Sequence, residues 1–420
     1  MTKTQGWILH VDGDGFFAYC ELTRFPHLRG KPVVVGEERG IACAMTYEAK
    51  ALGIPRGYPI FKIRTEFPQV TILPCHFELY EAYAQKLVAL LDPHVVRLER
   101  YSIDECFAQV NLPVDWSKEQ IEQWLRTIKQ DIQNKLGLTY SFGIARTKVL
   151  AKIASKYQKP NGLTVVMETD EKNILRETEA TSIWGIGRRL SVRFERLRIS
   201  TALEFAKWSA EKVADKFNQP VYDLWQELNG VRVLSINNDS SLPKSLQSTR
   251  SFTPFSIDKD YLIAELFQNV DTVCARMRHY GVKTKSVSMY FKTSERRYHG
   301  TSITLALYTD SPIAMQNQIA EAVETFFDTS VRYKATGVTA WGLRADDDVP
   351  FDLFGTQETH SDTDTVMNTI DAIRRKFGKT SIGFMATMPS AKDRLIKANK
   401  RRETDHFVYG LPLPYLGEVS

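Results

Sequence analysis

The chain has 420 residues, with 55 Lys and Arg against 50 Asp and Glu, so its formal net charge is +5. This length exceeds one compact core and predicts several domains. A content of 43% hydrophobic and 25% charged residues excludes a chain that is disordered throughout. No window reaches the roughly 18 apolar residues of a membrane span, and the five cysteines include no Cys-x-x-Cys pair. We therefore expect a cytoplasmic protein with no membrane partner and no disulfide framework.

Short apolar runs and amphipathic segments alternate over the first 168 residues. The run Trp7–Val11 predicts a buried strand that ends at Asp12-Gly13-Asp14-Gly15, and a helix is expected from Phe16 to about Arg24. Residues 31–75, which contain short apolar runs between Gly and Pro, predict a small α/β insert. Further helices are expected over 79–91, 116–136 and 148–156, and strands over 95–98, 103–110 and 140–144.

The second half of the sequence divides at a polar stretch. Residues 169–240 are predicted to be mostly helical, and the Ser/Asn/Asp-rich stretch 237–241 is the best linker candidate. An α+β pattern follows, with helices expected over 260–280 and 313–327 and strands over 286–292, 301–308 and 337–343. An acidic patch at 346–348 opens a less regular tail.

Three carboxylates stand out by their positions at predicted strands. Asp12 ends the first strand, and Asp104 and Glu105 lie in a predicted hairpin. Carboxylates from separate strands of one sheet can hold two divalent cations for phosphoryl transfer. The alternative is that they are turn and helix-cap acids. Because neighbours on a regular strand point to opposite faces, Asp104 and Glu105 can share a metal only in an irregular hairpin.

Four motifs resemble those of the Y-family, translesion DNA polymerases, and they occur in the family's order over residues 7–165. Val11–Glu21 is similar to the opening motif, and Ser102–Phe107 to the second acidic motif. Residues 47–59 are similar to the family's fingers motif, and residues 141–162 are similar to its last motif. The chain length and the form of the fingers motif resemble the bacterial UmuC-like branch, the catalytic subunit of DNA polymerase V.

The resemblance implies a right-hand polymerase built of α/β and α+β domains. The expected parts are a palm (1–30 and 76–168), small fingers (31–75), a thumb with a helix-hairpin-helix (169–240), a little finger that binds DNA (241–345) and a C-terminal tail (346–420). Little-finger residues 244–344 contain 13 Lys and Arg against 9 Asp and Glu. This local excess is consistent with a DNA-binding domain.

The resemblance also implies a metal site. Asp12, Asp104 and Glu105 are expected to be catalytic and to hold two Mg²⁺ ions, with the backbone carbonyl of Gly13 as a further ligand. Asp14 is left outside the site, because an acid at this position can equally cap the following helix.

Four residues are expected to bind the incoming dNTP. By the resemblance, Phe17 lies beneath the sugar, where its ring excludes a 2′-hydroxyl, while Phe16 is expected in the core. Tyr47, Lys50 and Lys159 are candidates to hold the triphosphate. Lys50 stands where the family more commonly has Arg, and lysine is a point charge without the guanidinium fork.

Basic and glycine residues suggest a DNA interface. Five basic residues and no acid occur between residues 141 and 167, which favours a face for phosphates over a solvated helix face. In the helix-hairpin-helix, Gly185, Gly187 and Arg188 are expected to bring backbone amides to DNA phosphates. Lys244 and Arg250 of the little finger are expected to contact DNA.

The tail contains one short motif. Phe351, Leu353 and Phe354 resemble the sliding-clamp-binding peptide of bacterial polymerases, although Pro350 stands in place of its leading Gln. The alternative is an ordinary apolar packing segment. The basic run 392–402 is either a second nucleic-acid or partner contact or a soluble tail.

The sequence thus predicts a template-directed DNA polymerase that adds dNMP to a primer 3′-hydroxyl by two-metal phosphoryl transfer. The short fingers predict low fidelity and synthesis across damaged templates, as part of DNA repair in an SOS response. Expected partners are primer–template DNA, dNTPs, a sliding clamp and accessory subunits. The alternatives are a catalytically impaired DNA-binding accessory protein of the same family and another palm-type nucleotidyl enzyme, such as a cyclase.

Overall fold

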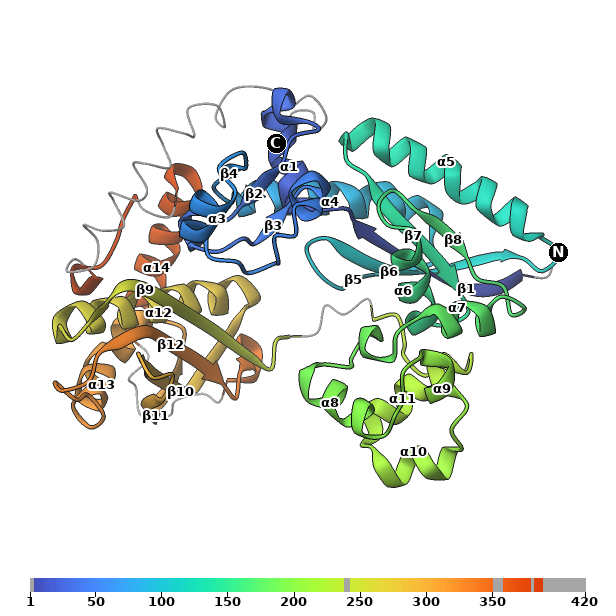
Figure 1. Ribbon diagram of the computed structural model, residues 1–420. Helices are drawn as coiled ribbons and strands as arrows, with labels where there is room; N and C mark the ends of the chain where they lie inside the picture. Colours follow the sequence, from blue (N-terminus) through green and yellow to red (C-terminus); the bar gives the residue numbers. More distant parts are fainter. Residues whose placement is uncertain (1–3, 238–241, 350–357, 379–380, 388–420) are drawn as a thin grey trace. The chain divides into compact units, whose positions relative to one another are not determined.

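The computed structural model describes residues 4–237, 242–349, 358–378 and 381–387 (Figure 1). The chain forms two compact units that divide between residues 239 and 240. No helix among the described residues is long and apolar enough to cross a membrane.

The first unit is built around a five-stranded sheet with the order β5-β6-β1-β7-β8. Its strands are β1 (Thr4–Gly13), β5 (Arg97–Arg100), β6 (Glu105–Pro113), β7 (Tyr140–Ala145) and β8 (Leu163–Val165). The central strand β1 runs antiparallel to both β6 and β7. Because side chains alternate along a strand, Leu9 and Val11 lie in one hydrophobic core and Ile8 lies in the other. The strands predicted from the sequence are confirmed with shifted ends: β1 begins earlier than expected, β5 covers 97–100 where 95–98 was predicted, and β6 begins at Glu105 where 103 was predicted.

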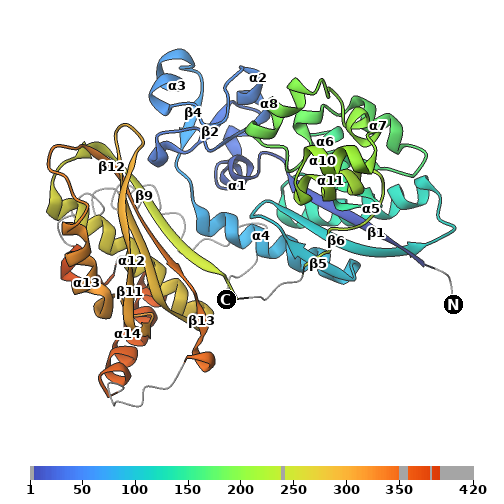
Figure 2. The same ribbon diagram turned by 90° about the horizontal axis from the view of Figure 1, so that it is seen from below.

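Helices cover both faces of this sheet (Figures 1 and 2). The core on the Leu9 face includes α1 (Phe16–Arg24), α4 (Phe77–Leu91) and α5 (Lys118–Leu136), with the short 3₁₀ turn η3 (Asp92–His94) after α4. The other face is covered by α6 (Lys148–Tyr157). A Cβ atom on Gly143 of β7 would lie 2.1 Å from the backbone nitrogen of Ser155. Only glycine therefore allows α6 to pack this closely on the sheet.

A small insert separates α1 from α4. Its sheet has the order β3-β2-β4, and its own core includes Val34, Ile54 and Ile63. The elements are η1 (Pro26–Leu28), β2 (Val33–Val35), η2 (Glu37–Arg39), β3 (Ala44–Met45), α2 (Tyr47–Ala51), α3 (Ile60–Glu66) and β4 (Thr71–Leu73). The small α/β insert predicted over residues 31–75 is confirmed.

The end of the first unit is helical, as predicted. It comprises α7 (Glu171–Glu177), η4 (Ala180–Ser182), α8 (Arg188–Arg196), α9 (Ala202–Ala206), α10 (Ala210–Lys216) and α11 (Gln219–Leu228). The buried rings of Phe194 and Phe205 lie 4.9 Å apart, and Phe217 packs against both. These helices share one core with α6.

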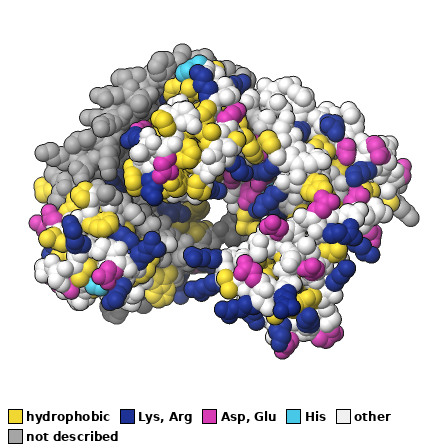
Figure 3. All heavy atoms as spheres, in the orientation of Figure 1, with side chains coloured by type: hydrophobic (Ala, Val, Ile, Leu, Met, Phe, Trp, Pro, Cys, Tyr) yellow, Lys and Arg dark blue, Asp and Glu magenta, His cyan; other side chains and the backbone are white. Residues whose placement is uncertain are grey.

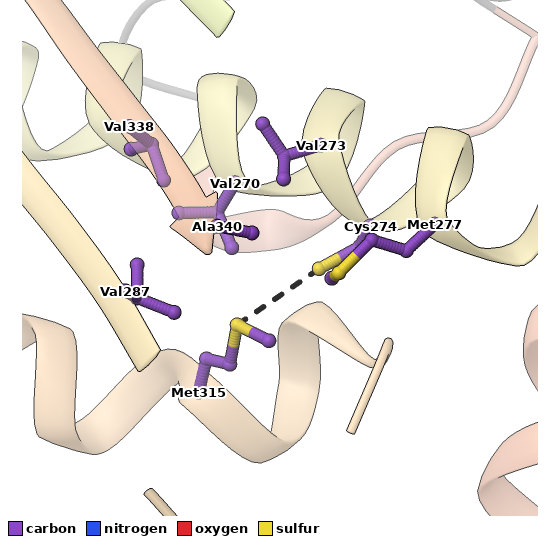
Figure 4. Close-up of a pocket in the computed structure, with 8 residues that line it drawn as sticks. All are labelled: Val270, Val273, Cys274, Met277, Val287, Met315, Val338 and Ala340. Atoms are coloured by element: carbon purple, nitrogen blue, oxygen red, sulfur yellow. Dashed lines mark hydrogen bonds between the residues drawn. The ribbon is translucent and has the colours of Figure 1, made fainter. Parts of the chain in front are cut away.

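The second unit is an antiparallel sheet covered by helices on one face. The strand order is β11-β10-β12-β9. Its elements are β9 (Ser245–Ser256), α12 (Lys259–Tyr280), β10 (Val282–Thr293), β11 (Tyr298–Thr309), α13 (Pro312–Glu324), β12 (Tyr333–Trp341) and β13 (Arg344–Ala345). The core between sheet and helices is entirely apolar around Cys274 Sγ and Met315 Sδ, which lie 3.9 Å apart (Figure 4). This part of the core is a small packing gap, and its lining offers no polar group to a ligand.

The tail differs from the prediction. After η5 (Asp346–Asp348), the segment Glu358–Phe377 forms helix α14, followed by η6 (Met385–Thr387). Arg278 of α12 binds Asp371 at 2.6 Å, and Arg374 of α14 binds Asp271 at 2.9 Å. The expectation of an irregular tail is therefore wrong for α14, which docks on α12. The predicted clamp-binding residues and the basic run 392–402 lie outside the described residues.

Candidate active site

The carboxylates of Asp12 and Glu105 lie side by side on two adjacent strands of the first sheet. Asp12 at the end of β1 is the registered partner of Glu105 at the start of β6, so both side chains lie on one face of the sheet. His10 shares this face, and its Nε2 lies 3.3 Å from Oε2 of Glu105. One ligand atom from each of the three residues lies within 4.8 Å of the others. Two carboxylates and one imidazole thus form a compact donor cluster.

Asp104 lies beside this cluster, in a bend that precedes β6. The Ser102 hydroxyl donates to Asp104 Oδ1 at 2.5 Å, and the Gly13 N–H donates to the Asp104 carbonyl at 2.8 Å. On a regular strand, Asp104 and Glu105 would point to opposite faces of the sheet. The bend at Asp104 provides the irregular hairpin that these two acids need in order to share a metal. Burial is the main cause that raises the pKa of Asp12, and the charges of Asp104 and Glu105 add to it.

Glu105 is held on two sides by basic groups. Lys152 of α6 donates to both carboxylate oxygens, at 2.8 and 2.9 Å. Burial raises the pKa of Glu105, but hydrogen bonds and charge from His10 and Lys152 outweigh it and bring the pKa to about 2. His10 is fully buried, with Nδ1 2.7 Å from the Ser155 hydroxyl oxygen. Burial lowers the pKa of His10 to about 4. At neutral pH the cluster therefore holds an ionised Glu105 beside a neutral imidazole.

Most of the basic run in and around α6 is paired with acids of other elements. The pairs are Arg146 with Glu171, Lys148 with Glu99, Lys152 with Glu105, and Lys159 with Asp12. Lys148 and Lys152 are buried, whereas Lys156 is exposed. The interpretation of this run as a phosphate-binding face is therefore wrong for Lys148 and Lys152. The acids that neutralise these lysines are distant in the sequence, so the local sequence around the lysines does not reveal them.

Three aromatic rings enclose the Lys152 ammonium group. Its Nζ lies 4.7 Å from the ring centre of Tyr101, 5.2 Å from Trp184 and 5.8 Å from Phe107. The Trp184 indole N–H donates to the Tyr101 hydroxyl at 3.1 Å. Cation–π attraction therefore adds to the ion pair with Glu105. Trp184 comes from the segment before α8, so this contact joins the helical part of the unit to the sheet.

Asp14 positions the loop that carries Lys159. Its carboxylate is buried and accepts hydrogen bonds from the Asn161 N–H and the Ser141 hydroxyl, both at 2.8 Å. On the other side, Lys129 Nζ donates to the Asn161 carbonyl at 2.6 Å. Asp14 thus fixes the loop, and no side-chain bond caps the start of α1.

An aromatic cluster lies at the start of α1. Phe16 is buried, and Phe17 is half-buried. The Phe17 ring stacks on Tyr80 with centroids 4.4 Å apart and an interplanar angle of 10°. Phe77 packs edge-on against Phe17 at 5.5 Å. Phe17 thus has one supported face and a partly exposed ring.

Tyr47 and Lys50 lie on α2. Burial and the charges of Asp14 and Asp12 raise the pKa of Tyr47, so its phenol keeps its proton beside the acids. Lys50 is exposed, and its Nζ lies 5.6 Å from the Tyr47 ring centre. These two residues and Lys159 offer one neutral donor and two cations.

The predicted hairpin of the thumb begins at two glycines. Gly185 has a φ of +90°, and Gly187 is the N-cap of α8 without a side-chain cap. The exposed arginines of α8 are Arg188, Arg189, Arg193 and Arg196. Figure 3 shows Lys and Arg side chains gathered over this helix. The N-terminal amides of α8 and these guanidinium groups provide donors for an anion.

The two predicted DNA contacts of the second unit differ in their surroundings. Lys244 is exposed. Arg250 lies on the helix-covered side of β9, where its Nε is 3.2 Å from the buried Glu265 carboxylate. The guanidinium group of Arg250 is thus engaged within the protein.

The donor cluster fits a hard divalent cation. Carboxylate oxygens are the ligands that Mg²⁺ and Mn²⁺ prefer, and Asp12 and Glu105 present them from adjacent strands. Burial, followed by the charges of Asp104 and Glu105, raises the pKa of Asp12, and a bound cation would favour the ionised form of this acid. Lys159 provides the positive charge next to Asp12 in this structure.

His10 and Lys152 are site residues that the sequence reasoning missed as such. A signal for His10 was present, because it stands two residues before Asp12 in a predicted strand and must share its face. The role of Lys152 as partner of Glu105 required knowledge of how α6 packs on the sheet.

Comparison with known proteins identifies the class of fold. A solved chimera of the Y-family DNA polymerases Dbh and Dpo4 superimposes with a TM-score of 0.68, covering 81% of this chain and 99% of that chain at 23% identity. The DinB structure from Sulfolobus solfataricus gives a TM-score of 0.53 at 23% identity, covering 80% and 98%. At these identities the likeness shows the fold alone, which is the right-hand fold of Y-family DNA polymerases.

Sequence comparison then gives the family. The impB/mucB/samB family model matches residues 11–156, and the model of that family's C-terminal domain matches residues 243–353. DNA polymerase IV of Methanoculleus marisnigri is 29% identical over 318 residues, covering 74% of this chain and 88% of that protein. Protein UmuC of Salmonella typhimurium is 26% identical over 388 residues, covering 89% and 92%. The chain belongs to the impB/mucB/samB family of Y-family translesion DNA polymerases.

Proposed function

We propose that this chain is a template-directed DNA polymerase that adds dNMP to a primer 3′-hydroxyl during synthesis across damaged DNA. The registered pair Asp12 and Glu105, with Asp104 beside it, is the observation that supports this proposal most strongly. In this role the three acids and the Gly13 carbonyl hold two Mg²⁺ ions. Bound there, the ions lower the pKa of the 3′-hydroxyl and neutralise the triphosphate and the pyrophosphate leaving group.

The surrounding cations then divide between two tasks. Lys152 is buried and enclosed by rings, so it stays with Glu105 and fixes the orientation of that carboxylate. Lys159 is partly exposed and lies on a held loop beside Asp12. It is free to exchange Asp12 for a phosphate oxygen of the dNTP when cations occupy the carboxylates. Tyr47 and Lys50 supply a neutral donor and a second cation for the triphosphate.

The half-buried Phe17 selects the sugar in this proposal. Its ring is backed by Tyr80 and therefore presents a firm surface to the incoming nucleotide. A 2′-hydroxyl would clash with that surface, so dNTPs are favoured over rNTPs. Selection against the 2′-hydroxyl means that the proposed product is DNA and not RNA.

Primer–template DNA is held by the thumb and by the second unit. The α8 arginines and the exposed N-terminus of α8 supply phosphate donors. In the second unit, the strand register places polar and small side chains, together with the rings of Tyr290, Tyr298 and Trp341, on the sheet face opposite α12. Among the registered positions of this face, all in the described part of the chain, none is Asp or Glu. The residues on this face include Ser286, Ser288, Lys292, Ser302, Gly337, Thr339, Gln247 and Thr249.

The short fingers support tolerance of damaged templates, because a small insert cannot enclose the nascent base pair tightly. A sliding clamp remains a proposed partner through Phe351, Leu353 and Phe354, and accessory subunits remain proposed partners. Removal of the Leu353 and Phe354 side chains should abolish capture of a bacterial sliding clamp, and retained capture would refute that role.

Primer extension tests the proposed function. Wild type and Asp104→Asn are compared with Mg²⁺ and dNTPs on undamaged and abasic templates. Asp131→Asn is the matched control, because Asp131 is a half-buried acid of α5 that pairs only with Lys135 among the ion pairs of the described residues. We expect extension on both templates by wild type and Asp131→Asn and none by Asp104→Asn. Equal extension by wild type and Asp104→Asn would refute the metal site. No extension by wild type would favour the impaired accessory protein.

A further inference from the structure

Glu21 is a fully buried carboxylate that the proposed metal site does not use. It lies on α1, one helical turn after Phe17, and its side chain is 0% exposed. Burial of a carboxylate is unfavourable unless hydrogen bonds and charge compensate for it. A buried acid at this position therefore requires an account of what it holds.

Glu21 binds side chains of α1, of α4 and of the residue that precedes α4. The Tyr80 hydroxyl donates to Glu21 Oε1 at 2.5 Å. His76 Nδ1 lies 2.9 Å from the same oxygen, and Arg24 Nη1 lies 3.4 Å from Oε2. The arginine compensates the charge, and the phenol forms the shortest of these contacts. The carboxylate thus fixes the hydroxyl end of Tyr80.

The opposite constraint on Tyr80 is the ring of Phe17. The two rings are stacked at 4.4 Å, and Phe77 packs edge-on against both at 5.5 Å. Because Phe17 and Glu21 are four residues apart on α1, they lie on the same side of that helix. Phe17 and Glu21 are therefore connected in two ways. They are one helical turn apart on α1, and both contact Tyr80, Phe17 by ring stacking and Glu21 by a charge-assisted hydrogen bond.

We propose that Glu21 is a positioning residue for sugar selection, acting through Tyr80 on Phe17. The inference rests on the proposed function, in which the Phe17 ring meets the 2′ position of the nucleotide. A steric barrier discriminates only if the ring cannot retreat when a 2′-hydroxyl presses on it. The bond to Glu21 prevents Tyr80 from moving away and so keeps the Phe17 ring in place.

The test compares dCTP and rCTP insertion opposite template guanine by the full chain. Tyr80→Phe retains the stacked ring and removes only the hydroxyl bound by Glu21. We expect the ratio of kcat/KM for dCTP to that for rCTP to fall about tenfold, which corresponds to about 1.4 kcal/mol, while dCTP insertion stays near wild type. Glu21→Gln keeps the size of the side chain and weakens the charge-assisted bond, so we expect a smaller fall in the ratio.

Tyr83→Phe is the matched control. Tyr83 is also buried on α4, and its hydroxyl donates to Thr23 Oγ1 at 3.0 Å. A general loss of core stability would affect both phenol variants, whereas the proposal predicts an altered sugar ratio only for Tyr80→Phe. An unchanged ratio in Tyr80→Phe, or an equal change in Tyr83→Phe, would overturn the proposal.

Phe17→Ala separates this proposal from the proposed function. If Phe17→Ala strongly increases rCTP insertion but Tyr80→Phe does not, the role of Glu21 is refuted and the polymerase function stands. If Phe17→Ala leaves the sugar ratio unchanged, the assignment of Phe17 fails, and the role of Glu21 fails with it. A wild-type protein without any insertion refutes both proposals.

Discussion

Lys152 and Glu105 form a buried ion pair, with Nζ 2.8 Å from Oε2, next to the carboxylate of Asp12. The lysine side chain is 7% exposed and the glutamate side chain 13%. The pair joins α6 to the first residue of β6. It therefore orients a proposed metal ligand and also ties a helix to the sheet.

Lys152→Met should destabilise the protein, because it leaves the Glu105 charge buried without its cation. Breaking a buried ion pair from one side lowers the free energy of unfolding by about 3 kcal/mol, measurable by urea unfolding. Lys156→Met, on the same helix but exposed, is the control and should change little. Equal stability of the two variants would contradict the role of the pair.

Stability should fall as the pH drops from about 6.5 to about 4, because of His10. The unfolded chain protonates this imidazole near 6.5, whereas burial lowers its pKa to about 4 in the folded protein. The unfolded state thus binds more protons in this window, and the loss reaches about 3 kcal/mol. Urea unfolding between pH 7 and 4 measures it. His10→Gln should flatten the curve; an unchanged slope would count against a neutral buried His10.

Glu105 adds a second window at lower pH. Its pKa is about 2 in the folded protein against an ordinary value near 4.5, so its contribution is complete above 4.5 and is lost as the pH falls towards 2. Glu105→Gln should remove this part of the acid sensitivity. Circular dichroism between pH 5 and 2 measures it, and identical acid transitions for the variant and wild type would refute this contribution.

Mg²⁺ should stabilise the folded protein, because a bound cation offsets the burial and the neighbouring acids that raise the pKa of Asp12. A ligand that binds only the folded state at 100 times its Kd adds about 2.7 kcal/mol. Thermal unfolding with and without Mg²⁺ at matched ionic strength measures the shift in Tm. Asp12→Asn should abolish the shift. The same shift in wild type and variant would place the binding elsewhere.

Arg374→Met should loosen α14 from α12. Arg374 is 11% exposed and binds Asp271, which is 5% exposed, so the variant leaves a buried acid unpaired. The expected loss is about 3 kcal/mol in the stability of the second unit. Hydrogen exchange of α14 amides measures it, with the exposed Arg375→Met as control. Unchanged protection in Arg374→Met would show that this pair does not hold the helix.

The sequence was sufficient where local pattern determines structure. The apolar run Trp7–Val11 predicted β1, and α1 begins and ends where predicted. By contrast, β9 was not predicted, because it is an edge strand whose register leaves only Leu246 and Phe252 as buried apolar side chains. Helix α14 was missed since its docking depends on arginine–aspartate pairs made with α12.

The site was predictable in its acids and less so in its cations. Asp12, Asp104 and Glu105 follow from strand ends and motif resemblance. The acid-free run that contains Lys148 and Lys152 looked like a phosphate-binding face, but its counter-ions come from Glu99 and Glu105. Such pairs join residues about fifty positions apart, and no local pattern encodes them.

The most direct test of the central claim is the position of bound metal. Crystals of the protein with primer–template DNA, a non-hydrolysable dNTP analogue and Mn²⁺ would locate the ions by anomalous scattering. We predict two peaks coordinated by the carboxylates of Asp12, Asp104 and Glu105, with Lys159 moved from Asp12 to the triphosphate. Peaks elsewhere, or none at these acids with the nucleotide bound, would contradict the account.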